Sequence, residues 1–134
     1  MPSVSPDGQW IAFAGQTNFG QTYDEGRNSI WLLSNTGELR RLEAPPNQGR
    51  TPAWSPDGQW LAFESDREDR EGPNDLYAVF IINRDGTDLR RVTPYGWDAN
   101  HPAWSPDAKQ LVLSALHTKG RNARGIAMID VAKP

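Results

Sequence analysis

Short apolar runs and polar breaks alternate along this chain, and the same order of runs returns at a fixed interval. The segment "TPAWSPDGQW" at 51–60 comes back as "HPAWSPDAKQ" at 101–110, and the related "MPSVSPDGQW" occupies 1–10. The three copies therefore start 50 residues apart. A repeat of this length predicts one structural unit that is built several times and stacked on itself.

Each copy contains short runs that are typical of β-strands. In the middle copy, "TPAWS" ends at a Pro-Asp-Gly turn, "QWLAFES" and "LYAVFIIN" follow, and "RDG" precedes the more polar "TDLRRVT". Because these breaks favour tight turns, we expect four strands joined as an antiparallel meander. The third copy supplies only three such runs, so the pattern predicts eleven strands, and no segment keeps a helical period.

The middle strands are apolar on both faces, as in "WLAF", "AVFII" and "LVL". A sheet with one face in water alternates polar and apolar residues, so these sheets must be covered on both sides. Four-stranded units that stack face to face are propeller blades. We therefore predict an all-β fold in one repeat domain, 1–134, with blades at about 1–47, 48–97 and 98–134, the last lacking its fourth strand. Tryptophans at repeat positions are expected in the core between blades: Trp10, Trp54, Trp60 and Trp104.

The repeat resembles that of the TolB-like propellers, whose units are called PD repeats and are related to WD repeats. The residues that carry the resemblance are Pro52, Trp54 to Gly58, Leu61 to Phe63, Asp85-Gly86 and Arg91 to Thr93. Two positions depart from the pattern: Val4 stands where 54 and 104 carry Trp, and Ala108 where 8 and 58 carry Gly. A WD repeat would end its third strand in Trp-Asp, whereas here that pair is expected between two units, in the connection "PYGWDANH".

The resemblance implies two functions of different classes. One is a non-enzymatic recognition platform, as in the periplasmic TolB propeller that docks a lipoprotein. The other is an accessory propeller of a prolyl oligopeptidase-type hydrolase, whose catalytic domain would follow with its own serine elbow. A fold shared this widely does not choose between them, and both stay open here.

Composition narrows the chemistry further. The chain has 134 residues and no Cys, which excludes disulfides, thiol catalysis and cysteine-based metal sites. The net charge is −3 and acids dilute the arginine pairs, so we expect no nucleic-acid partner. The first residues lack the basic start and apolar run of a signal peptide, and no run approaches the roughly 20 apolar residues of a spanning helix, so no membrane insertion is expected.

The Ser-Pro-Asp-Gly turns are expected to be structural. A catalytic site would not need three copies, whereas Ser and Asp side chains at a tight turn bind its backbone donors. The motif comprises Ser5, Pro6, Asp7, Gly8, Trp54, Ser55, Pro56, Asp57, Gly58, Trp104, Ser105, Pro106 and Asp107.

Nothing in the sequence indicates an enzyme. The sequence has two histidines, His101 and His117, but it lacks the Gly-x-Ser-x-Gly motif that would supply a nucleophilic serine. It also lacks a glycine-rich phosphate loop. The acidic segment from Asp66 to Asp75 does not have the spacing of a calcium loop and is partly neutralised by arginines. We therefore expect no catalytic residue, no metal and no cofactor.

The expected binding surface lies on one rim of the blades. In a meander, the connections after the second and fourth strands share a rim, and here these are the long ones, whereas the opposite rim has only tight turns. Binding residues gather on such variable loops. The candidates for contacts with a protein partner are Asp66, Arg67, Tyr95, Trp97, Asp98 and His101.

Three blades cannot close a ring, since propellers have about four to eight. The outer faces of the first and last blades would expose apolar strands, which is rare on monomers. We therefore expect half of a six-bladed propeller, with a homodimer completing the ring. The alternative is that the chain is a fragment of one longer six-bladed polypeptide.

Overall fold

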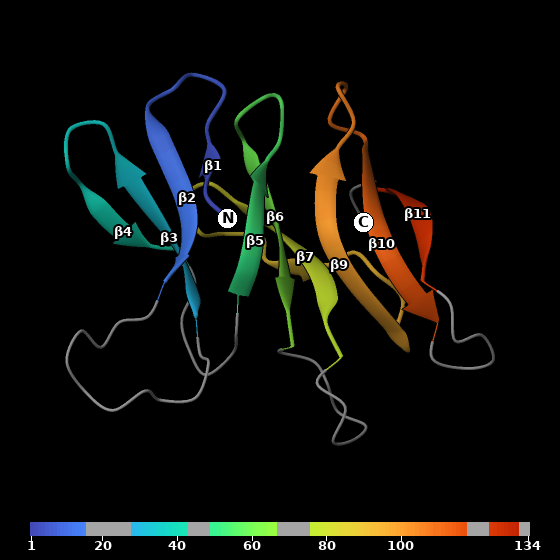
Figure 1. Cartoon of the computed structure of the whole chain (residues 1–134). Helices are drawn as coiled ribbons and strands as arrows, with labels where there is room; N and C mark the ends of the chain where they lie inside the picture. Colours follow the sequence, from blue (N-terminus) through green and yellow to red (C-terminus); the bar gives the residue numbers. More distant parts are fainter. Residues whose placement is uncertain (16–27, 43–48, 67–75, 118–123, 132–134) are drawn as a thin grey trace, which may run out of the picture.

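The structure, a computed structural model, describes residues 1–15, 28–42, 49–66, 76–117 and 124–131. These residues form eleven strands in three antiparallel sheets and contain no helix, as the sequence predicted (Figure 1). They also contain no helix long and apolar enough to cross a bilayer.

Each sheet is a meander, which we call blade 1, blade 2 and blade 3 in chain order. The sheets have four, four and three strands, and every strand pairs with its neighbour in the sequence. Blade 1 comprises β1 (Ser3–Val4), β2 (Trp10–Gly15), β3 (Ser29–Ser34) and β4 (Leu39–Arg41); blade 2 comprises β5 (Gly49–Trp54), β6 (Trp60–Ser65), β7 (Ala78–Asn83) and β8 (Arg90–Arg91); blade 3 comprises β9 (Trp97–Trp104), β10 (Gln110–His117) and β11 (Gly125–Asp130).

One boundary differs from expectation. The prediction that Trp97 and Asp98 lie in a connection between blades is wrong, because both belong to β9. Their polar surroundings look like a loop, but β10 extends to His117 and gives them backbone partners, Trp97 opposite His117 and Asp98 opposite Leu116.

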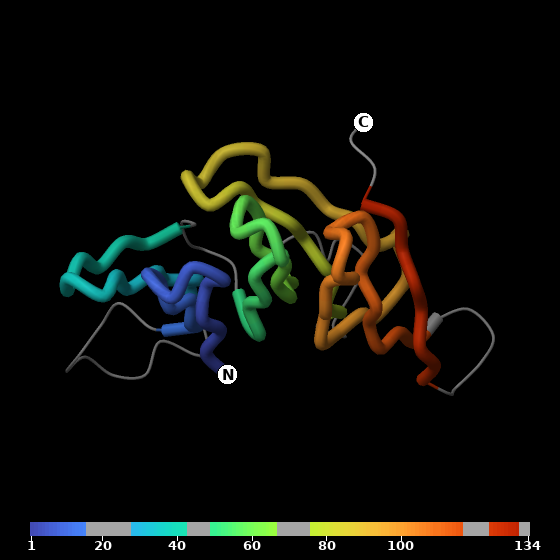
Figure 2. Tube along the Cα trace, turned by 90° about the horizontal axis from the view of Figure 1, so that it is seen from above, coloured from blue at the N-terminus to red at the C-terminus, as the bar shows by residue number. Residues whose placement is uncertain are grey.

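The three blades fan out from one side. Seen from above, the innermost strands β1, β5 and β9 gather on that side, and the sheets spread away from it (Figure 2). β5 contacts both β1 and β9. The arrangement is that of adjacent blades around a propeller axis, with the innermost strands nearest the axis.

The register is the same in all blades, so positions can be compared directly. The start of the third strand pairs with the same position of the second strand in each blade, with Gly15 facing Ser29, Ser65 facing Ala78 and Ala115 facing Gly125. The second and third strands of each blade therefore present equivalent side chains on each face of the sheet.

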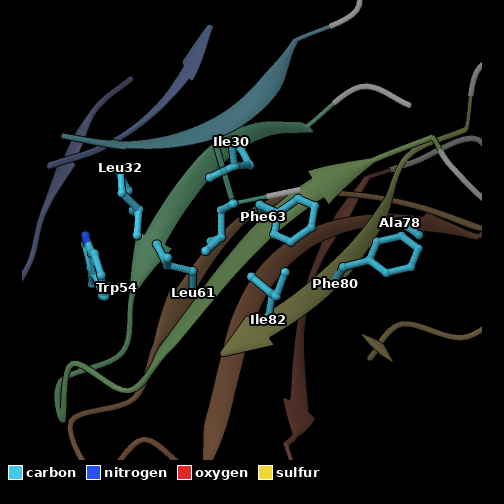
Figure 3. Close-up of a cluster of buried hydrophobic side chains, with 10 residues drawn as sticks. Ile30, Leu32, Trp54, Leu61, Phe63, Ala78, Phe80 and Ile82 are labelled. Atoms are coloured by element: carbon cyan, nitrogen blue, oxygen red, sulfur yellow. The ribbon is translucent and has the colours of Figure 1, made fainter. Parts of the chain in front are cut away.

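A first core fills the space between blades 1 and 2. Blade 1 contributes the fully buried Ala12, Ile30 and Leu32, which lie on one face of β2 and β3. Blade 2 covers them with Phe63 and Phe80, whose ring centroids are 6.1 Å apart, together with aliphatic side chains (Figure 3). Trp54 is buried here, as expected, and Trp10 packs half-buried at the edge.

A second core fills the space between blades 2 and 3. The opposite face of blade 2 contributes Ala62, Val79 and Ile81, all fully buried. Blade 3 contributes Leu111 and Leu113, with Trp60 and Trp104 half-buried around them. Blade 2 is therefore covered on both faces, which explains why its strands have no polar alternation.

The outer face of blade 3 carries the same positions without a cover. Val112, Ile126 and Met128 are the equivalents of Ala62, Val79 and Ile81 in the shared register, and they are 36%, 85% and 63% exposed. On the other end of the chain, Ile11 of blade 1 is 39% exposed, although its equivalents in blades 2 and 3 are fully buried.

The indole N–H of an innermost strand ties each blade to the one before it. Trp54 Nε1 donates to the carbonyl oxygen of Ser3 at 3.1 Å, and Trp104 Nε1 donates to that of Ala53 at 3.0 Å. Both bonds join residues 51 positions apart. Val4 occupies the same position in blade 1, and its side chain has no hydrogen-bond donor.

The Ser-Pro-Asp-Gly turn has the same hydrogen bonds in every blade. In blade 2, Ser55 Oγ donates to Asp57 Oδ1 at 2.5 Å and accepts from the amide of Trp60 at 2.9 Å, while Asp57 accepts from the amide of Gln59 at 3.0 Å. The same bonds recur with Ser5 and Asp7 and with Ser105 and Asp107. Both side chains thus bind backbone donors, which is what a structural turn requires.

Candidate binding rim

The strand ends define two rims. The tight turns lie at the upper end of the sheets in Figure 1, and the segments that join β2 to β3, β6 to β7 and β8 to β9 start and end at the lower end. We call the lower end the long-loop rim and the upper end the tight-turn rim. Of the predicted binding residues, Asp66, Tyr95, Trp97 and Asp98 lie at the long-loop rim, His101 lies midway along β9, and Arg67 lies outside the described residues.

Glu64 is a buried acid at the junction of blades 2 and 3. Its side chain is 3% exposed, and its Oε1 accepts a hydrogen bond from the backbone amide of His101 at 2.7 Å. Its Oε2 lies 3.8 Å from Nε of Arg50. Because a buried carboxylate is costly unless it is paired, these contacts explain how Glu64 is accommodated.

Arg50 extends this network across the rim. Its guanidinium carbon lies 3.7 Å from the centroid of the Tyr77 ring, a cation–π contact. The backbone amide of Tyr77 donates to Asp98 Oδ1 at 3.1 Å, and the other oxygen of Asp98 forms an ion pair with Arg124. Charged side chains, together with the ring and the backbone amide of Tyr77, thus connect β5, β9 and the residues that precede β7 and β11.

His101 sits on a strained bulge that recurs in two blades. Thr51 and His101 hold the same repeat position, both precede a proline, and their φ angles are +47° and +55°. The strand register shifts at both places. Such backbone costs about 1–3 kcal/mol for residues other than glycine, so its neighbours must hold it in place. Glu64 does this for His101, and the imidazole, 67% exposed, faces outward.

Tyr95 is the most exposed aromatic of the rim. Its side chain is 69% exposed, and the guanidinium carbon of Arg91 lies 4.1 Å from its ring centroid. Arg91 also donates to the carbonyl oxygens of Thr93 and Pro94, at 2.7 and 2.9 Å. Arg91 therefore braces the connection that precedes β9, and Tyr95 is presented to solvent. Trp97, by contrast, is half-buried.

The tight-turn rim has a different electrostatic character. Hydrogen bonds from Ser5 and from the amide of Gln9 hold the pKa of Asp7 below its ordinary value, and Ser105 and the amide of Lys109 do the same for Asp107. The hydroxyl and amide of Thr87 lower the pKa of Asp85 in the turn between β7 and β8. These carboxylates are engaged by their own turns.

Sequence reasoning missed four residues of the rim: Arg50, Glu64, Tyr77 and Arg124. One signal was available for Glu64, because it is a lone charge directly after the apolar run "WLAF" of the same strand, and its equivalents are Ala14 and Ser114. Among the residues that the structure describes, no group of three or more His, Asp or Glu side chains is placed to hold a metal ion. The arrangement suits recognition of polar groups through charged and aromatic side chains.

Comparison with solved structures identifies the fold. A protein of Agrobacterium tumefaciens assigned as TolB matches with a TM-score of 0.75 and 21% identity, over 96% of this chain and 44% of that one. An oligogalacturonate lyase from Vibrio parahaemolyticus gives 0.71 and 18%, over 98% and 38%. Puromycin hydrolase gives 0.63 and 18%, over 99% and 22%.

The chain has the fold of a TolB-like β-propeller. It spans less than half of the length of each of these structures. No family model matches the chain, and no curated protein sequence matches it. The propellers that it resembles include a TolB, a lyase and a hydrolase, so the likeness describes architecture and leaves the function to the site.

Proposed function

We propose that the chain is a non-enzymatic recognition scaffold that binds a protein partner through the long-loop rim. The observation that carries the proposal is the paired network from Glu64 to Arg124, which fixes the rim and leaves His101 and Tyr95 exposed beside it. Exposed aromatic and charged side chains on a rigid frame are typical of interface anchors. A periplasmic location, implied by the family resemblance, belongs to the same proposal.

A site-specific cross-linking experiment tests this proposal. A photoactivatable amino acid replaces Tyr95 or Trp97 on the long-loop rim, and Asn35 or Asp85 on the tight-turn rim as matched controls. Cell extract from the source organism is then irradiated with each variant. We expect the same cross-linked polypeptide from both long-loop positions and none from the controls. A polypeptide captured only from position 35 or 85 would overturn the choice of rim.

We also propose that a second copy completes the propeller. The exposed Val112, Ile126 and Met128 of blade 3 correspond to the face that blade 2 buries against blade 3, and Ile11 of blade 1 corresponds to the opposite face. Each end of the chain thus presents one half of an interface that the chain already forms twice. Two copies related by a two-fold axis would satisfy both ends and give six blades.

Light scattering tests the ring. Since one chain weighs 15.0 kDa, a dimer weighs about 30 kDa. Val4→Trp should restore the missing indole hydrogen bond and tighten dimerisation about fivefold per interface, which corresponds to ~1 kcal/mol. Ile126→Asp should dissociate the dimer. A folded 15.0 kDa species that persists at high concentration, and that Val4→Trp does not change, would refute the ring.

The second candidate is an accessory propeller of a prolyl oligopeptidase-type hydrolase. The match to puromycin hydrolase over 22% of its length favours this alternative. In that case the apolar end faces would be covered by further blades of one longer polypeptide. A tandem polypeptide of two copies joined head to tail tests this alternative. If the tandem is monomeric and its end faces are buried, blade 1 and blade 3 can pack against each other within one polypeptide. Binding of a hydrolase domain to the tandem would favour the accessory role.

A further inference from the structure

The outer edge of blade 3 differs from the outer edges of blades 1 and 2. Among the described residues, β3 pairs with β4 and β7 pairs with β8, whereas β11 pairs with β10 alone. Ile30 and Val79 accept backbone hydrogen bonds from Leu42 and Val92, at 2.8 and 3.0 Å, and Ile126 is their equivalent in β11. An edge of this kind is a template for an added strand.

The fourth strands of the other blades are recognised through one arginine. The guanidinium carbon of Arg40 lies 5.2 Å from the centroid of the Trp10 ring, and that of Arg90 lies 5.8 Å from that of Trp60. In the shared register, both arginines are opposite the position that Met128 holds in blade 3. A fourth strand on β11 would therefore place a side chain opposite Met128 on the same face.

Blade 3 has a different receiver for that side chain. Gln110 stands at the position of the two tryptophans and is directly opposite Asp130. The side-chain amide of Gln110 donates to Asp130 Oδ1 at 2.8 Å. The equivalents of Asp130 in the other blades are Ser34 and Asn83, so only blade 3 has a carboxylate here. A carboxylate held in this way is a good acceptor for a guanidinium.

We propose that the edge of β11 binds an extended antiparallel segment of a partner polypeptide, with an arginine opposite Met128 and an aliphatic residue opposite Ile126. The arginine would lie over Gln110 and pair with Asp130. The aliphatic residue would cover Ile126, which is 85% exposed. The chain's own "LRRL" at 39–42 has this chemistry, since it occupies the equivalent edge of β3. Strand addition of this kind gains affinity from the main chain and specificity from alternate side chains.

A synthetic peptide with the sequence TGELRRLE, copied from 36–43, serves as the probe. It is titrated into the whole chain while amide exchange is followed residue by residue. Binding should slow the amides of Ile126, Met128 and Asp130, whose equivalents face the fourth strand. An alanine in place of the first arginine, the equivalent of Arg40, should weaken the peptide about fivefold.

Two matched variants make the test specific. The second arginine of the peptide, equivalent to Arg41, projects to the opposite face, where Arg41 covers Trp31 and β11 has only Ala127. Its replacement by alanine should change affinity little. Asp130→Asn in the chain should weaken the arginine peptide and leave the alanine peptide unaffected, which is a double-mutant cycle.

Three outcomes would overturn the proposal. They are the absence of slowed exchange in β11, equal affinity of the peptide with and without its first arginine, and slowed exchange in β11 that depends on the concentration of the chain alone. The last outcome counts only if it persists in Ile11→Asp, which removes the ring interface of blade 1; it would then mean that a second copy occupies the edge. This control is needed because the ring would also cover Ile126 and Met128 of blade 3.

Discussion

Blades 2 and 3 share one pattern and differ in what covers them. Val79 and Ile81 of blade 2 are fully buried, whereas Ile126 and Met128 at the same positions of blade 3 are 85% and 63% exposed. The side chains are alike in chemistry. The difference therefore lies in what surrounds these side chains: blade 2 has a fourth strand and a following blade, and blade 3 has neither among the described residues. An apolar strand pattern thus describes a surface that can be buried, while the burial itself depends on the strands packed against it.

The largest expected effect comes from placing a charge at this position in each blade. Val79→Asp would bury an unpaired carboxylate and should cost more than about 4 kcal/mol, enough to prevent folding. Ile126→Asp should change the unfolding free energy of the monomer by no more than about 0.5 kcal/mol. Chemical denaturation of both variants at a concentration where the chain is monomeric measures the contrast. If Ile126→Asp also unfolds the monomer, Ile126 is buried in solution and the difference in burial between blades 2 and 3 is wrong.

Removal of side-chain volume gives a smaller contrast at the neighbouring position. Ile81→Ala leaves a cavity between blades 2 and 3 and should cost about 2–5 kcal/mol. Met128→Ala removes an exposed side chain and should stay within about 0.5 kcal/mol. Urea titrations of the two variants, compared with the parent, provide the values. Equal losses would indicate that Met128 is covered in solution.

Much of the fold could be predicted from the sequence because it repeats locally. The turns use Pro, Asp and Gly in a fixed order, and the strands of blade 2 lack polar alternation, so the meander and its stacking both follow. The start of β9 could not be predicted, since Asp98 and Asn100 have loop-like side chains and their pairing depends on how far β10 extends. Strand pairing that depends on the length of a neighbouring strand cannot be read from the sequence of the segment itself.

The site was predictable only in part. Tyr95 and Asp98 were predicted as rim residues because the segment that holds them has no counterpart in the first copy. The contact between Glu64 and His101 could not be predicted, because the two residues meet only after blades 2 and 3 have packed. The positive φ of Thr51 and His101 was also not predictable, since residues other than glycine seldom adopt it and a β-branched residue such as Thr does so least.

A gentler change tests the turns of the same two blades. Gly58 and Ala108 both have positive φ, +70° and +59°, which an L side chain adopts at a cost. Ala108→Gly should therefore stabilise the chain by about 0.4–1 kcal/mol, and Gly58→Ala should destabilise it by about 1 kcal/mol. Thermal unfolding shifts of opposite sign are expected. A loss of stability in Ala108→Gly would show that the backbone strain at 108 is relieved in solution.

The smallest effect concerns pH. Hydrogen bonds lower the pKa of Asp85 in blade 2 and of Asp107 in blade 3 below the ordinary 3.8, so their carboxylates stabilise the fold above that pH. This stabilisation is lost as the pH falls through the lowered values. The stability advantage of the parent over Asp85→Asn or Asp107→Asn should therefore shrink as the pH is brought below about 4.

The two indole hydrogen bonds have a geometric consequence. The bonds of Trp54 and Trp104 differ by only 0.1 Å in length and reach back to the same place on the preceding blade. Each bond fixes the distance between the first strands of two neighbouring blades and so helps to set the angle between them. Val4 of blade 1 cannot form this hydrogen bond. In the proposed ring, the interface between blade 1 and the second copy would therefore be held by side-chain packing alone, and we expect the ring to open there first.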